Sequence, residues 1–226
     1  MKNVVIKIDR AIKQLYNLES PHRAENFLIE PNSPKARSIP IKPISDQQAA
    51  VIIKYSAKDA SNVDLGIYFG DKIKADLSRM EAIEPAQWPH QELNALSVAA
   101  EEISHFHYLV DRFQAEQRVT QLELELQGEI DKFLLIFYLV QQTMGESREI
   151  FEKIFEQVFH HFTWAGNLSA EQKQRYEQAN AQARQFVKNF GDTMWGRRSQ
   201  DQCLEYLRYF YRLTQSEKLG FISRLP

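Results

Sequence analysis

Hydrophobic residues recur at intervals of three and four along most of the second half of the chain, a spacing that places them on one face of an α-helix. The clearest example is the segment at about 120–143. Its apolar stripe consists of Leu122, Leu126, Ile130, Phe133, Phe137 and Val140. Comparable patterns predict helices at about 91–115, 148–164, 169–191 and 199–214. Three of these segments open with capping-box spacing, at Thr120, Ser169 and Ser199.

The N-terminal part of the chain has a different pattern. Val4–Ile8 predicts a short strand and Arg10–Leu18 predicts a helix. Four prolines follow between residues 31 and 43. Proline removes a backbone donor and fixes φ, so this stretch is expected to be an extended linker.

Two segments beyond the linker are rich in β-branched and aromatic residues, Ala50–Tyr55 and Val63–Phe69. The turn-forming residues at 58–62 separate them, so the pattern predicts a β-hairpin at about 50–69. A short helix is expected at Asp71–Met80.

Together these elements predict a mainly α fold. We expect a bundle of about five antiparallel helices, joined by short loops, with a small N-terminal α/β region that contains the hairpin. The predicted organisation is an N-terminal segment and Pro-rich linker at 1–45, followed by a mainly helical domain at 46–226.

Composition excludes several classes of protein. The net charge is −2, so no general attraction to nucleic acid or to acidic membranes is expected. The longest apolar run, Phe133–Val140, is much shorter than the roughly 20 residues of a membrane-spanning helix. With Cys203 as the single cysteine, no internal disulfide can form, and we expect a soluble, cytoplasmic protein.

Acidic residues and histidines gather on the two helices expected at 91–115 and 120–143. Glu129 falls inside the apolar stripe of its helix and Glu125 lies at the edge of that stripe, so both should be largely buried. Glu101 and His105 share one face of the preceding helix, four residues apart. If the two helices are antiparallel, these four residues come to similar heights.

This set of residues predicts a metal site. Its expected ligands are Glu101, His105, Glu125 and Glu129, with His107 as the alternative imidazole. Carboxylates together with imidazole suit Mn, Fe or Zn, whereas carboxylates alone favour Mg.

Two resemblances bear on this site, and neither assigns the chain to a family. Glu102 and His105 have the Glu-x-x-His spacing of helical di-iron carboxylate proteins, but no other predicted helix carries a second such motif. The pair Glu101-Glu102 followed by Glu125 and Glu129 is similar to the magnesium motifs of the all-helical nucleotide pyrophosphatases. His105 and Lys132 stand where that family has acidic ligands.

A structural role is the competing interpretation of the same residues. Glu125 and Glu129 would then pair with Arg112, Lys132 or His107 in a network that stabilises the fold. Glu129 in particular is expected to be buried and bonded to a group on the preceding helix.

We therefore carry two functional hypotheses. The first is a non-enzymatic interaction or regulatory protein that forms a homo-oligomer or binds a protein partner. It rests on the abundance of phenylalanine and tyrosine, 14 and nine residues. The second is a metal-dependent helical enzyme whose carboxylate and histidine site lies between the helices at about 91–115 and 120–143. Binding of nucleic acid is a minor alternative that rests on basic and aromatic residues near the C-terminus.

Overall fold

The computed structural model describes residues 1–30, 49–55, 63–81, 83, 90–160, 168–196 and 199–226. In this part of the chain the fold is mainly helical, with one two-stranded sheet, as predicted. The predicted linker at 31–43, the turn at 58–62 and residues 161–164 of the helix predicted at 148–164 lie outside the described residues. The division of the chain at residue 45 therefore stays a prediction.

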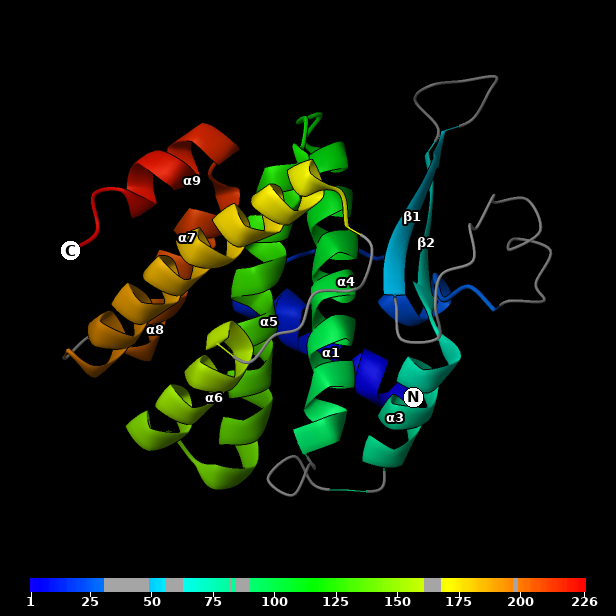
Figure 1. Cartoon of the computed structure of the whole chain (residues 1–226), viewed down its shortest axis with the longest axis horizontal. Helices are drawn as coiled ribbons and strands as arrows, with labels where there is room; N and C mark the ends of the chain where they lie inside the picture. The colour runs from blue at the N-terminus through cyan, green and yellow to red at the C-terminus, as the bar shows by residue number, and fades with distance from the viewer. Residues whose placement is uncertain (31–48, 56–62, 82, 84–89, 161–167, 197–198) are drawn as a thin grey trace.

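Two long antiparallel helices form the centre of the molecule, α4 (His90–Gln114) and α5 (Gln121–Met144) (Figure 1). The Thr120 hydroxyl accepts the Glu123 amide and caps α5, which confirms the predicted start of this helix. Leu126, Ile130 and Phe133 are fully buried. Almost every residue from Phe133 to Val140 is buried as well, because α5 is covered by helices on several sides.

The elements on the α4 side are α1 (Lys2–Tyr16), the hairpin and α3 (Asp71–Met80). The strands β1 (Ala49–Tyr55) and β2 (Val63–Phe69) pair antiparallel, with Ile52 opposite Gly66. The segment after α1 extends this pairing, since Ile29 and Phe27 exchange backbone hydrogen bonds with Ile67. The structure confirms the predicted hairpin and the predicted helix at Asp71–Met80.

The predicted strand at Val4–Ile8 is wrong, because α1 runs without a break through it. Val4, Val5, Ile8 and Ile12 follow the helical spacing and are all buried. These side chains face α4, α5 and α8, so packing outweighs the β preference of a short β-branched run.

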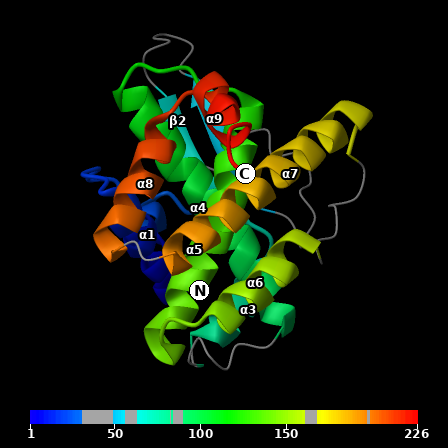
Figure 2. The same cartoon turned by 90° about the vertical axis from the view of Figure 1, so that its left-hand side faces the viewer.

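The α5 side is covered by α6 (Arg148–His160) and α7 (Ala170–Trp195). Figure 2 shows α7 running obliquely across α5. The expected end of this helix near Gly191 is wrong, and the helix continues to Trp195. Gly191 serves packing instead, since a Cβ there would lie 2.6 Å from Cζ of Phe151 on α6.

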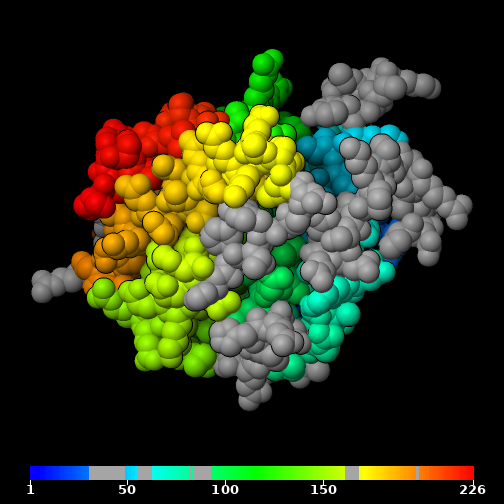
Figure 3. Space-filling view, in the orientation of Figure 1, coloured from blue at the N-terminus to red at the C-terminus, as the bar shows by residue number. Residues whose placement is uncertain are grey.

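The chain finishes with α8 (Gln200–Arg212) and α9 (Gln215–Ile222), of which α9 was not expected from the sequence. In Figure 3 the surface passes from α9 through α7 to α6 on one face of the molecule. Among the described residues, no helix is both long enough and apolar enough to cross a membrane.

Candidate metal site

Three of the predicted ligands come together between α4 and α5. Glu101 and His105 on α4, and Glu125 on α5, each offer one ligand atom, and these atoms all lie within 4.8 Å of one another. We call these three residues the metal-site cluster. His105 and Glu125 are buried, with 7% and 8% of their surface exposed, and Glu101 is half-buried. The four-residue spacing of Glu101 and His105 therefore does place them on the face of α4 that meets α5.

His105 has an unused ring nitrogen. Its Nδ1 lies 3.7 Å from Glu102 Oε2, and its Nε2 lies 3.9 Å from Glu125 Oε2. Nε2 is buried and makes no hydrogen bond to any described residue. Burial favours the neutral ring, but the carboxylates of Glu102, Glu125 and Glu101 outweigh it and raise the pKa of His105 to about 9.

Gly128 on α5 makes room for this imidazole. A Cβ at residue 128 would lie 2.5 Å from Nε2 of His105 and 3.3 Å from Cγ of Glu101. Contacts as short as the first do not occur between unstrained atoms, so only glycine allows α5 to approach His105 this closely. The identity of residue 128 is thus tied to the site.

The carboxyl group of Glu125 is buried close to two other carboxylates. Burial, with Glu101 and Glu102 nearby, raises its pKa to about 7 despite the favourable effect of His105. Arg175 on α7 supplies a permanent positive charge, and its Nε lies 4.0 Å from Glu125 Oε1. A carboxyl group with a raised pKa beside other carboxylates would gain from a further positive charge.

Glu129 is not a member of the cluster but is linked to Glu101 through Lys132. It is 8% exposed, as expected, but the predicted direct bond to α4 is wrong. Its Oε1 accepts a hydrogen bond from Lys132 Nζ at 2.7 Å, and its Oε2 accepts one from Asn180 Nδ2 on α7 at 3.3 Å. Lys132 Nζ also donates to Glu101 Oε2 at 3.2 Å, so Glu129 reaches α4 only through the lysine.

Lys132 is the structural partner that the competing interpretation named. Burial works against its charge, but Glu101 and Glu129 outweigh that cost and raise its pKa. The same ammonium lowers the pKa of Glu101 in spite of burial, whereas burial raises the pKa of Glu129. A charged Lys132 therefore holds two carboxylates that are expensive to bury unpaired.

His107, the alternative imidazole, points away from the cluster toward α1. Its Nε2 lies 2.8 Å from Asp9 Oδ1, and Asp9 also accepts the backbone amide of Ala24. Burial lowers the pKa of His107, so we assign a neutral ring that donates Nε2–H to Asp9. This pair ties α1 to α4.

Arg112, the remaining partner proposed from the sequence, binds neither Glu125 nor Glu129. Its guanidinium donates to the backbone carbonyls of Tyr211, Arg212 and Leu213 and so holds the turn between α8 and α9. Of the three proposed structural partners, Lys132 alone is in place.

A second buried polar network lies on the other side of α5 and was missed from the sequence. At its centre is Lys218 of α9, fully buried, whose Nζ donates to Tyr108 Oη at 2.9 Å and to Gln127 Oε1 at 2.6 Å. Burial lowers the pKa of Lys218 to about 7. The pattern of apolar residues does not predict a buried lysine on a short C-terminal helix.

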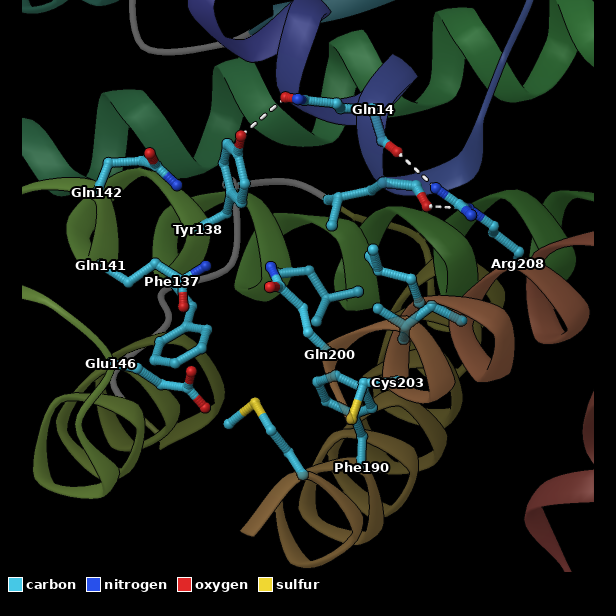
Figure 4. A pocket seen from close by; sticks show the side chains of 15 residues that line it. Gln14, Phe137, Tyr138, Gln141, Gln142, Glu146, Phe190, Gln200, Cys203 and Arg208 are labelled. Atoms are coloured by element: carbon cyan, nitrogen blue, oxygen red, sulfur yellow. Dashed lines mark hydrogen bonds between the residues drawn. The ribbon is translucent and has the colours of Figure 1, made fainter. Parts of the chain in front are cut away.

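A groove of about 450 Å³ lies between α1, α5, α7 and α8. Figure 4 shows the side chains that line it. Its wall includes Phe137, Phe190 and Cys203, and its edge includes Gln141 and Gln200. Arg208 lies beside it, but its guanidinium is occupied by the backbone carbonyls of Gln14 and Leu15. The groove shares no lining residue with the metal-site cluster.

The chemistry of the metal-site cluster is that of a mixed nitrogen and oxygen ligand set. Two ligands about 2.1 Å from one ion are separated by roughly 3–4 Å. The 3.9 Å between His105 Nε2 and Glu125 Oε2 lies in that range. All three ligand atoms lie within 4.8 Å of one another, so Glu101, His105 and Glu125 can reach one divalent ion once their side chains move closer together.

Comparison with known proteins adds no further assignment, because no protein-family model, curated protein or solved structure matches this chain.

Proposed function

We propose that the protein binds one divalent transition-metal ion through Glu101, His105 and Glu125, and that it acts as a metal-dependent helical enzyme. The observation that carries this proposal is the buried Nε2 of His105, which has no hydrogen-bond partner among the described residues and faces Glu125. An imidazole nitrogen left unused beside carboxylates is costly unless it binds a ligand.

The ligand set favours Mn, Fe or Zn over Mg. Imidazole is a good ligand for the transition metals, whereas Mg prefers oxygen ligands and retains its water. The neighbouring carboxylates raise the pKa of His105 to about 9, so a metal ion competes with a proton for this imidazole and we expect metal binding to release that proton.

Three protein ligands leave coordination positions for water or a substrate, which is the arrangement of catalytic metal sites. A bound ion in this position would act as a Lewis acid or would activate a water molecule. Arg175 approaches the cluster from α7 and adds a positive charge beside Glu125 that can attract an anionic group.

The test is the metal content of purified protein, measured by mass spectrometry after exposure to Mn²⁺, Fe²⁺ or Zn²⁺. We expect about one ion per chain in the wild type and a reduction of at least about tenfold in affinity for His105→Ala and Glu125→Gln. His160→Ala is the matched control, since His160 is exposed and pairs only with Glu156 of its own helix among the described residues. A wild type that takes up no metal, or variants with unchanged affinity, would remove the proposal.

The second candidate is a cytoplasmic interaction or regulatory protein that self-associates. Tyr209 supports it, because this aromatic side chain is 58% exposed beside a shallow groove between α8 and α9. Exposed aromatic residues are common at protein interfaces.

Sedimentation velocity at micromolar to tens-of-micromolar concentration tests self-association. We expect a species larger than 26.5 kDa for the wild type and a shift toward monomer for Tyr209→Lys. Tyr138→Phe is the control, since it changes a partly buried tyrosine outside that groove. A clean monomer of the wild type over this range would exclude the second candidate.

A further inference from the structure

We infer that the ammonium group of Lys132 occupies the position that a second metal ion would take between Glu101 and Glu129. Lys132 thereby limits the site to one metal ion. This inference rests on the proposed function of the metal-site cluster. It concerns the neighbouring half of the site, where Glu101 and Glu129 face each other across the lysine.

The geometry places the ammonium between the two carboxylates. Lys132 Nζ lies 3.2 Å from Glu101 Oε2 and 2.7 Å from Glu129 Oε1. The lysine is 8% exposed and Glu129 is equally buried, so little solvent shields these charges. Asn180 holds the other oxygen of Glu129, which fixes the orientation of that carboxylate.

Glu101 belongs to both halves of the site. It offers an oxygen to the metal-site cluster, and its Oε2 accepts a hydrogen bond from Lys132. A carboxylate that serves a metal ion and a neighbouring second cation together is the bridging arrangement of two-metal sites. In this chain the ammonium group of Lys132 occupies the position of the second cation.

The charge balance supports the same reading. Four carboxylates gather here, Glu101, Glu102, Glu125 and Glu129. The permanently charged side chains that contact them are Lys132 and Arg175. Arg175 contacts Glu125, so Lys132 is the only cation that the described residues supply to Glu129. Without it, the half-buried Glu101 and the buried Glu129 would face each other with no cation between them, an arrangement that attracts a metal ion.

The decisive experiment compares metal stoichiometry in the wild type and in Lys132→Met, by calorimetric titration with Mn²⁺ and by direct metal analysis. We expect about one ion per chain in the wild type and about two in the variant. In metal-free buffer the variant should melt about 10 °C lower than the wild type, because removal of one partner leaves buried charges unpaired. Added Mn²⁺ should restore most of this loss.

Two further variants sharpen the result. Lys132→Met combined with Glu129→Gln removes one positive and one negative charge, so binding should return to about one ion per chain. Lys218→Met is the matched control, because it removes another buried lysine that has no contact with the cluster, and it should keep one ion. If Lys132→Met does not fold without metal, Lys132→Gln, which keeps an amide donor for Glu129, carries the same test.

The outcomes separate this inference from the proposed function. A wild type with one ion and a Lys132→Met variant that also binds one ion, with unchanged affinity, overturns the role of Lys132 alone. A wild type that binds no metal overturns the proposed function and this inference with it.

Discussion

A single glycine decides how closely α5 can approach the imidazole of His105. Glycine in the middle of a helix costs roughly 1 kcal/mol relative to alanine. At residue 128 this cost has a visible reason, because any Cβ would overlap with Nε2 of His105. The position of the histidine, and with it the geometry of the metal-site cluster, depends on the missing side chain.

Gly128→Ala should therefore separate stability from metal binding. The gain in helix propensity, about 1 kcal/mol, opposes the strain of displacing His105, so the free energy of unfolding should change little. Metal affinity should fall by at least about tenfold, because the imidazole no longer faces Glu125. Both quantities are accessible by urea denaturation and calorimetric titration.

The control for this prediction is Gly220→Ala in α9, where a Cβ would meet no atom within 4 Å. That variant should become more stable by up to about 1 kcal/mol and bind metal as the wild type does. Unchanged metal affinity in Gly128→Ala would show that the close approach has no role in binding.

At the residue scale, helical angles were enough to bring Glu101, His105 and Glu125 to one interface. They left the partner of Glu129 open among Arg112, Lys132 and His107, because long, flexible side chains can reach a carboxylate from many positions. They also left His107 as an open alternative. Its partner, Asp9, directly follows Val4–Ile8, the segment predicted as a strand, and the helix α1 that presents Asp9 to α4 is therefore not predicted there.

At the scale of elements, the C-terminal helix α9 is attached to the core through an unusual residue. Lys218 is fully buried against Tyr108 of α4 and Gln127 of α5. Burial and the nearby Arg112 lower its pKa, while Glu123 and Asp131 raise it, and the net value is about 7. The docked helix thus prefers a neutral lysine more strongly than the unfolded chain does.

This preference gives stability a pH dependence of known sign. Between about pH 7 and pH 10 the unfolded chain binds a proton at Lys218 that the folded chain has released, so stability should rise with pH in that window. Below about pH 7 Lys218 is protonated in both the folded and the unfolded chain, and the loss of stability caused by burying its charge is at its full size. Relative to Lys218→Met, the wild type should gain about 1 kcal/mol per pH unit in the free energy of unfolding.

Urea denaturation at several pH values measures this difference. Lys153→Met, which removes an exposed lysine of α6, should follow the wild type throughout. Parallel pH curves for the wild type and Lys218→Met would rule out a lowered pKa at Lys218.

Among the elements, α3, α5 and the hairpin match their predictions. The failures have specific causes. The β-branched residues of Val4–Ile8 suggested a strand, although the same residues also fit one helical face. The helix α9 is only eight residues long, and its buried residues, Lys218 and Ile222, form no apolar stripe.

At the scale of the whole molecule, α5 connects two buried polar networks. One faces α4 and α7 through Glu125, Glu129 and Lys132, and the other faces α4 and α9 through Gln127 and Asp131. Buried polar groups of this kind cost free energy unless they are fully paired. In the second network Lys218 donates to Tyr108 and Asp131 accepts from Ser104 and Gln127. In the first network Nε2 of His105 has no hydrogen-bond partner among the described residues.

The central claim is that Nε2 of His105 and the carboxylates beside it bind a metal ion. An anomalous difference map from crystals grown with Mn²⁺ tests this claim most directly. The account predicts one strong peak per chain, about 2.0–2.3 Å from Nε2 of His105 and from carboxylate oxygens of Glu101 and Glu125, with Lys132 still between Glu101 and Glu129. A map without a peak at this position, in crystals where His105 keeps its place beside Glu102 and Glu125, would contradict it.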